Sequence, residues 1–198
     1  MKILLSSNKM IINKYLKKKA KVGFIANASE LDSDRWYMEK DKKDLCDMGY
    51  NILDIDITNE TKETIINKFD LVDAIYVAGG NAFYLLQQLK IKNVLDELIS
   101  FANDKIYIGS SAGSCIACPN IDYLEKLDDR SEAPLLDNGN SMNLINGYIL
   151  PHYNSNKEYT KISDEIVDEY NNLEFIKLTN EQAIIVYDRD NYEIVETN

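Results

Sequence analysis

Several residue types that mark secreted, fibrous or nucleic-acid-binding proteins are scarce in this 198-residue chain. Its three cysteines are too few for a disulfide scaffold of this length and fit a reducing compartment. Eight glycines and three prolines exclude collagen-like and linker-rich chains. Because 33 Asp and Glu residues outnumber 22 Lys and Arg residues, the net charge of −11 opposes binding to nucleic acid or to an anionic membrane.

Long hydrophobic runs are also absent. No apolar stretch reaches the roughly 18 residues that a membrane-spanning helix needs, and the apolar stretch near the N-terminus is too short for a secretion signal. We therefore expect a cytoplasmic protein with neither a nucleic-acid nor a membrane partner. The length and the 45% share of hydrophobic residues predict one globular domain over residues 1–198, as a monomer or a homodimer.

Short apolar runs alternate along the chain with segments of helical length, a pattern typical of parallel strands joined by crossover helices. The sequence therefore predicts an α/β fold, a three-layer sandwich with helices on both faces of a mostly parallel sheet. A turn-like segment at 188–191 predicts a hairpin and an antiparallel C-terminal edge, and the polar stretch 125–141 predicts a loop over the sheet. The expected strands are 3–6, 22–26, 52–57, 74–78, 106–109, 148–150, 174–178, 183–187 and 192–195, and the expected helices are 31–48, 62–69, 83–90, 94–102 and 158–170.

The strongest chemical signal follows the expected strand 106–109. There the sequence Gly109-Ser110-Ser111-Ala112-Gly113 matches G-x-S-x-G, whose small residues permit a tight turn from a strand into a helix. Such a turn exposes the central hydroxyl, and the amide of Ala112 can then face a developing oxyanion. The spacing favours Ser111 as the nucleophile over Ser110 and Ser114. The alternative is a turn of small residues in which a serine is only the helix N-cap.

A second strand end carries two glycines. Gly79 and Gly80 follow the expected strand 74–78, and they let the backbone approach a ligand closely while their amides donate hydrogen bonds. We assign them to the other side of the oxyanion hole. A tight turn with Asn81 as the N-cap of the next helix explains the local sequence equally well, and both interpretations can hold together.

A nucleophilic serine needs a base, and the chain contains a single histidine, His152, at the end of the expected strand 148–150. A lone histidine is more often structural, but its place at a strand end, like that of the serine and the glycines, favours a catalytic role. An acceptor must orient the second ring nitrogen. The candidates from the sequence are Asp128, Asp129 and Glu181.

Together these motifs resemble those of the peptidase E family of serine peptidases, which contains aspartyl dipeptidases and has cyanophycinases as relatives. The resemblance covers residues 2–186. It rests on the order of Gly-Gly-Asn-Ala-Phe, Gly-Ser-Ser-Ala-Gly, an Asp-containing loop, Pro-His-Tyr and Leu-Thr-Asn-Glu. It implies a fold like that of class I glutamine amidotransferases. It also implies a short peptide as the substrate, hydrolysed through an acyl-enzyme on serine.

Matched by position, the resemblance assigns the nucleophile to Ser111, the base to His152, and the oxyanion hole to Gly80 and Ala112. The mechanism requires no metal, and we expect no cofactor. The C-x-x-C sequence at 115–118 does not change this expectation, because zinc would need further soft ligands and only Cys46 and His152 remain. Packing is its expected role.

The third catalytic member stays open between two positions that the family offers. The loop aspartate of the family falls at Asp129, or at Asp128 because the loop is longer here, and the strand-end glutamate falls at Glu181. Strand-end geometry favours Glu181 for the contact with His152, with Asp129 as the close rival.

One departure from the family concerns the substrate. Its aspartyl dipeptidases are expected to hold an acidic side chain with an arginine shortly after the histidine, but residues 156–161 contain only lysines as cations. Lys161 supplies charge without a bidentate fork, and we expect it to contact substrate together with Gly79 and Asn81. Selectivity for N-terminal aspartate is therefore not predicted. A non-catalytic binding or sensor module, and an isopeptidase or esterase using the same residues, are the alternatives.

Overall fold

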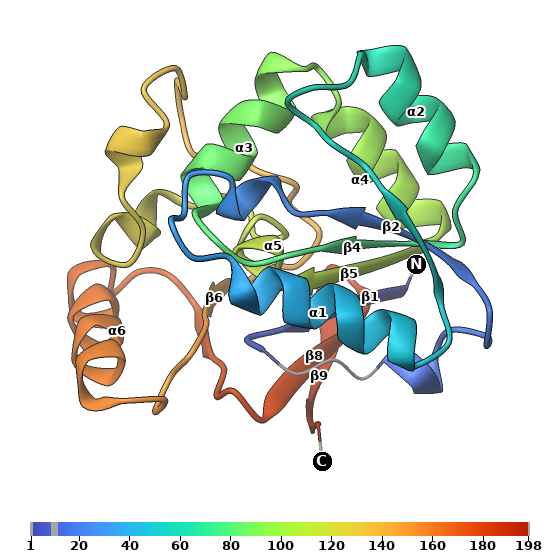
Figure 1. The fold of residues 1–198 in the computed structure, drawn as a ribbon. Coiled ribbons are helices and arrows are strands. Elements are labelled where there is room, and N and C mark those ends of the chain that lie inside the picture. The colour runs from blue at the N-terminus through green and yellow to red at the C-terminus, as the bar shows by residue number, and fades with distance from the viewer. Residues whose placement is uncertain (1, 9–11, 198) are drawn as a thin grey trace.

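In the computed structural model, residues 2–8 and 12–197 are described. A seven-stranded sheet forms the centre, with the strand order β3-β2-β4-β5-β1-β8-β9, and β6 and β7 pair in a separate sheet (Figure 1). The strands from β3 to β1 run parallel, whereas β8 and β9 run antiparallel to their neighbours. The strands are β1 (Lys2–Ser6), β2 (Lys21–Ile25), β3 (Asn51–Asp54), β4 (Ala74–Val77), β5 (Ile106–Ser110), β6 (Tyr148–Leu150), β7 (Phe175–Lys177), β8 (Gln182–Asp188) and β9 (Asn191–Glu196).

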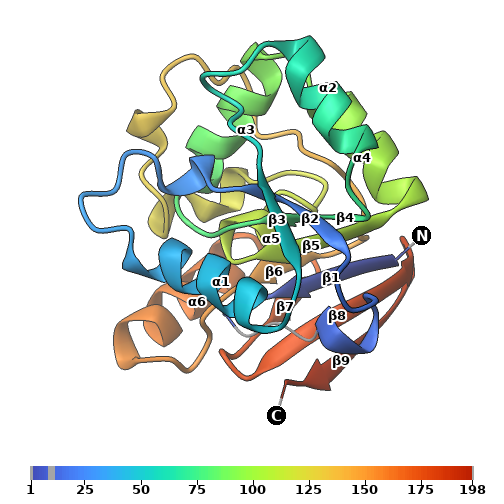
Figure 2. The ribbon, with the colours of Figure 1, turned by 45° about the vertical axis from the view of Figure 1, so that its right-hand side comes forward.

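Helices cover both faces of the sheet and complete a three-layer sandwich (Figures 1 and 2). The α-helices are α1 (Trp36–Asp47), α2 (Lys62–Asp70), α3 (Ala82–Ile91), α4 (Leu95–Asp104), α5 (Ala112–Cys115) and α6 (Lys157–Glu169), and the 3-10 helices are η1 (Ile12–Lys14), η2 (Asn27–Ser29), η3 (Asp122–Lys126) and η4 (Arg130–Glu132). Leu45 of α1 packs with Tyr76 of β4 on one face. Ile75 and Val77 of β4 pack with α2, α3 and α4 on the other. The alternating residues of one strand thus enter two separate cores, as the pleat of a sheet requires.

The α/β class, the mostly parallel sheet and the antiparallel C-terminal edge confirm the prediction from the sequence. Two expected strands, at 148–150 and 174–178, lie outside the main sheet and form their own parallel pair. The main sheet ends at β3 and β9, and β6 and β7 pair with each other and not with either of these edge strands. The polar stretch 125–141 is not a plain loop, since it contains η4 and the end of η3.

The helix expected at 31–48 begins later, at Trp36. Two aspartates in the preceding segment explain the difference. The carboxylate of Asp34 accepts a hydrogen bond from the backbone N–H of Trp36, and the carboxylate of Asp32 accepts one from the Tyr37 hydroxyl. Such side-chain contacts compete with the first turns of a helix and favour a later start.

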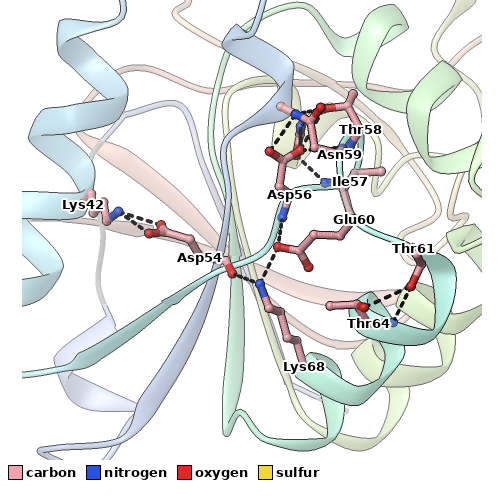
Figure 3. A network of polar contacts seen from close by, with 11 residues as sticks. Lys42, Asp54, Asp56, Ile57, Thr58, Asn59, Glu60, Thr61, Thr64 and Lys68 are labelled. Carbon is pink, nitrogen blue, oxygen red and sulfur yellow. Dashed lines mark hydrogen bonds and ion pairs between the residues drawn. The ribbon is translucent and has the colours of Figure 1, made fainter.

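A network of polar contacts fixes the loop that follows β3 (Figure 3). The Asp56 carboxylate accepts hydrogen bonds from the backbone N–H groups of Thr58 and Asn59 and from the side-chain amide of Asn27. Burial by itself would raise the pKa of Asp56, but these hydrogen bonds hold the pKa well below its usual range. Because Asn27 begins η2, the network anchors this 3-10 helix beside the sheet edge where the candidate site lies.

Candidate active site

A cleft of about 360 Å³ lies at the carboxyl ends of β1, β4 and β5. The carboxyl ends of parallel strands meet at one edge of the sheet, and this edge is where α/β proteins bind ligands. The described residues that line the cleft are Ser7, Asn8, Trp36, Tyr37, Asp41, Gly79, Gly80, Ser110, Ser111, Ala112, Cys115, Leu124, Leu127, Asp128, Pro151, His152 and Tyr159. The cleft therefore contains the serine, the histidine and the glycine pair that the sequence singled out.

The sharp turn predicted from G-x-S-x-G is present between β5 and α5. Ser111 adopts φ 49° and ψ −111°, a strained conformation for a residue with a side chain. Its backbone N–H donates to the carbonyl of Ser6 at 2.9 Å, which anchors the turn to the end of β1. The flanking glycines are required for packing. A Cβ atom at Gly109 would lie 2.4 Å from the Gly113 carbonyl oxygen, and one at Gly113 would lie 2.2 Å from that of Val77.

The hydroxyl of Ser111 meets the imidazole of His152. The distance between Ser111 Oγ and His152 Nε2 is 2.9 Å, and the other ring nitrogen, Nδ1, lies 2.8 Å from Oδ1 of Asn180. His152 follows β6 with a left-handed backbone (φ 60°), and its N–H donates to Ser7 Oγ at 3.1 Å. An amide oxygen at Nδ1 accepts the N–H of a neutral imidazole, and this leaves Nε2 able to accept the serine proton.

The structure therefore places Asn180 where the sequence suggested Glu181 or Asp129. Asn180 and Glu181 are neighbours in the turn between β7 and β8, so the expected segment is correct and the residue differs by one position. The Asp129 carboxylate instead accepts from the N–H of Ser131 and caps η4. An expectation confined to acidic side chains missed Asn180, because an amide oxygen accepts from the imidazole N–H as a carboxylate does.

The glycine pair lies against the serine. A Cβ atom on Gly79 would lie 3.1 Å from Ser111 Cβ. Gly80 has φ 134°, and a Cβ there would lie 2.2 Å from the Ala28 carbonyl oxygen of η2, so no side chain fits. The same Ala28 carbonyl accepts the N–H of Asn81 at 2.8 Å. η2 thus holds the glycine turn at the edge of the cleft. Ala112, the other residue expected at the oxyanion hole, directly follows Ser111.

Two residues expected to contact substrate lie elsewhere. Asn81 caps α3, since its Oδ1 accepts a hydrogen bond from the N–H of Tyr84. Its Nδ2 donates to the carboxylate of Glu132, and Asn81 does not line the cleft. Lys161 lies on the exposed side of α6, with its ammonium 3.6 Å from the carboxylate of Glu165. Tyr159 of the same helix does line the cleft, but Lys161 comes two residues later and therefore lies on a different face of α6.

The comparison with known proteins identifies the family. The model of peptidase family S51 matches residues 2–194. The chain belongs to peptidase family S51. It is accordingly a serine-type peptidase, a hydrolase.

Relatives of this peptidase occur in several bacteria. It is 38% identical over 172 residues to an uncharacterized peptidase of Listeria innocua, covering 85% of this chain and 81% of that one. It is 32% identical over 136 residues to peptidase E of a Nostoc species, covering 67% of this chain and 52% of that one. A crystal structure of a peptidase E protein from Listeria monocytogenes matches with a TM-score of 0.89 and 32% identity over 98% of both chains.

The charges in the cleft of the peptidase are carboxylates. Burial raises the pKa of Asp41 and that of Asp128 to about 6. Among the lining residues that the structure describes, no lysine or arginine balances them. Burial also lowers the pKa of His152 below its ordinary 6.5, although the hydrogen bond with Asn180 opposes part of that shift. Within residues 2–8 and 12–197, no cluster of three metal-ligating side chains occurs, and no helix is long and apolar enough to cross a membrane.

Proposed function

We propose that this peptidase hydrolyses short peptides, as a dipeptidase does, through an acyl-enzyme on Ser111 with His152 as the general base. The observation that carries the proposal is the 2.9 Å contact between Ser111 Oγ and His152 Nε2. It joins the serine of a strained turn to the single histidine of the chain. Nucleophilic catalysis by serine needs such a contact, with the base oriented from its other nitrogen, here by Asn180.

The reaction proceeds in two halves. Ser111 Oγ attacks the carbonyl carbon of the scissile bond while its proton moves to His152 Nε2, and the amides of Gly80 and Ala112 donate to the oxyanion. His152 then gives the proton to the leaving amine, which departs and leaves an ester on Ser111. Water attacks this ester with His152 again as base, and the serine and the free acid are regenerated.

The carboxylate of Asp128 supports an exopeptidase that acts at a free N-terminus. Asp128 Oδ2 accepts from the N–H of Ala82 at 2.7 Å, which holds the carboxylate beside the turn that carries Gly80. Its pKa of about 6 leaves it mostly ionised at neutral pH. An α-ammonium group is attached next to the scissile carbonyl, so a carboxylate close to the oxyanion hole can bind it. We therefore place the N-terminal residue of the substrate at Asp128.

Covalent labelling followed by hydrolysis assays tests the proposal. A fluorophosphonate should label Ser111 at neutral pH, and His152→Ala should remove the labelling. Dipeptides with a free amine should be cleaved, and their N-acetylated forms should be poor substrates. Absence of labelling would favour the non-catalytic alternative. Labelling together with cleavage of esters but of no peptide would favour the esterase.

Asn180 provides a prediction about the orientation of the base. Asn180→Ala should lower kcat on the order of 10²-fold with a smaller change in KM, because Nδ1 loses its acceptor. Asn180→Asp should retain much of the activity but move the acid limb of the pH–rate profile to higher pH, since a carboxylate raises the pKa of His152. Steady-state kinetics across pH measure both effects. The exposed Asn172 offers a control, and an Asn180→Ala enzyme as active as Asn172→Ala would contradict the assignment.

The pH dependence of catalysis should follow the lowered pKa of His152. The base acts as neutral imidazole, so kcat/KM should rise with pH through a midpoint below 6.5 and level off near neutrality. Asp128 also titrates at about 6, and the profile of Asp128→Asn separates the two groups because the limb of His152 persists there. A midpoint above 6.5 in that variant would contradict a buried imidazole as the base.

A further inference from the structure

A buried carboxylate with no role in the proposed reaction lies in the catalytic cleft. Asp41 of α1 lines the cleft and is only 7% exposed. Its Oδ2 accepts a hydrogen bond from the hydroxyl of Tyr76 at 2.6 Å. Among the residues that the structure describes, no lysine or arginine forms an ion pair with it. The charge of Lys40 acts on Asp41, but Lys40 forms its ion pair with Asp44, so Asp41 lacks the direct cation contact that buried carboxylates usually have.

The position of Asp41 connects it to the nucleophile. Tyr76 belongs to β4, next to β5 in the sheet, and the Ser110 side chain at the end of β5 acts on its buried hydroxyl, opposing part of the rise in the pKa of Tyr76. Ser110 directly precedes Ser111. Asp41, Ser110 and Ser111 all line the same cleft, so Tyr76 links the carboxylate to the strand end that carries the nucleophile. Because both residues line one cleft of about 360 Å³, a substrate bound at Ser111 can extend a side chain towards Asp41.

The approach to Asp41 has aromatic walls. Trp36 is 62% exposed although it lines the cleft, and Tyr37 follows it in the first turn of α1. Tyr37 and Asp41 are four residues apart on the helix, so they lie on the same face. Aromatic rings bind the aliphatic stem and the cationic end of long basic side chains. The walls and the carboxylate thus match a lysine or arginine side chain along its length.

The charge of the surroundings acts in the same direction. The chain has a net charge of −11, and Asp128 adds a second carboxylate to the cleft. Such a field concentrates cationic ligands and repels anionic ones. An acidic substrate side chain would meet no lysine or arginine among the described lining residues. A basic side chain would meet a buried carboxylate, already hydrogen-bonded on one oxygen and able to accept on the other.

We propose that Asp41 is a specificity-determining residue that selects peptides with a lysine or arginine side chain next to the scissile bond. This inference rests on the proposed function for the location of the scissile bond. The ammonium or guanidinium group donates to Asp41, the aliphatic stem packs along Trp36 and Tyr37, and the hydroxyl of Tyr76 holds the carboxylate in place. No covalent step is added to the reaction, and the effect is on binding and on kcat/KM.

Binding measured on the Ser111→Ala protein tests the inference without requiring turnover. By calorimetry, Lys-Ala or Ala-Lys should bind about 30-fold more tightly than the dipeptide with norleucine in place of lysine, which keeps the stem and removes the charge. Asp-Ala should bind most weakly. Adding Asp41→Asn should abolish the preference for lysine while leaving norleucine binding unchanged, because asparagine still accepts from Tyr76. Equal binding of the lysine and norleucine peptides would overturn the inference even if the Asp41 variant failed to fold.

Kinetics on the active enzyme separate this inference from the proposed function. Asp41→Asn should lower kcat/KM for the lysine dipeptide about 30-fold and leave the norleucine dipeptide unaffected. Asp44→Asn is the matched control, since Asp44 lies on the same helix but pairs with Lys40, and it should change either value by less than about twofold. An equal loss for both dipeptides would show a structural role and overturn the inference. Binding selectivity without turnover would overturn only the proposed function.

Discussion

Replacing Ser111 with alanine is expected to lower kcat for dipeptide hydrolysis by at least about 10³-fold and to remove fluorophosphonate labelling completely. In the proposed reaction the hydroxyl that lies 2.9 Å from His152 Nε2 forms the acyl-enzyme, and alanine offers no atom there that could accept the acyl group. What activity remains should come from the oxyanion donors acting on bound water. Single-turnover kinetics with mass spectrometry of the labelled protein measure both effects.

The fold of the Ser111→Ala protein should persist. Serine and alanine carry the same strain at φ 49°, and the backbone N–H bond to Ser6 does not involve the side chain. Thermal unfolding within a few degrees of the parent would separate lost chemistry from lost structure. Ser131→Ala removes an exposed hydroxyl and should retain full activity. If Ser111→Ala cleaved dipeptides as fast as Ser131→Ala, another residue would be the nucleophile.

Replacing Gly80 with alanine is expected to cause the largest loss of stability, about 3 kcal/mol or more of the free energy of unfolding. The added Cβ would lie 2.2 Å from the oxygen and 2.3 Å from the carbon of the Ala28 carbonyl, which are backbone atoms that cannot rotate away. The φ of 134° adds strain for any residue with a side chain. Urea unfolding followed by circular dichroism measures the loss. Protein that still folds should have lost activity, because the turn that carries the proposed oxyanion donor must move.

Gly49 supplies the control for Gly80. It also has a positive φ, 89°, but a Cβ there meets nothing within 4 Å. Gly49→Ala should therefore show the conformational strain alone, about 1 kcal/mol. The difference between the two variants isolates the collision with Ala28. Equal losses in the two variants would mean that η2 moves aside easily, and would contradict a glycine turn held by η2.

Patterns local in the sequence determined the fold class and the positions of the main groups. The alternation of apolar runs and helical segments was sufficient for the parallel sheet, because buried strands need continuous apolar residues. G-x-S-x-G directly after a strand predicted the strained turn at Ser111, because only small residues permit it. The presence of a single histidine then left His152 as the only imidazole that can meet the serine.

Residues chosen by contacts between distant segments could not be predicted in this way. Whether Asn180 or Glu181 reaches His152 depends on how the turn after β7 meets the end of β6, a separate sheet that the alternating pattern did not distinguish from the main one. Asn81 was expected both as a helix cap and as a substrate contact, and the contact of its amide with Glu132 of η4 leaves it only the cap. Lys161 has a suitable charge, but it lies on a face of α6 that does not line the cleft.

The sequence by itself determined which chemical groups this peptidase possesses, and the tertiary structure decided which of them meet. Asp41 is one of 33 acidic residues in the sequence, and nothing in its helical segment distinguishes it from Asp44. Burial against Tyr76 and a place in the cleft of Ser111 make it different. The physical reason is range: propensity and periodicity act over a few residues, whereas burial and hydrogen bonding depend on whatever segments the fold brings together.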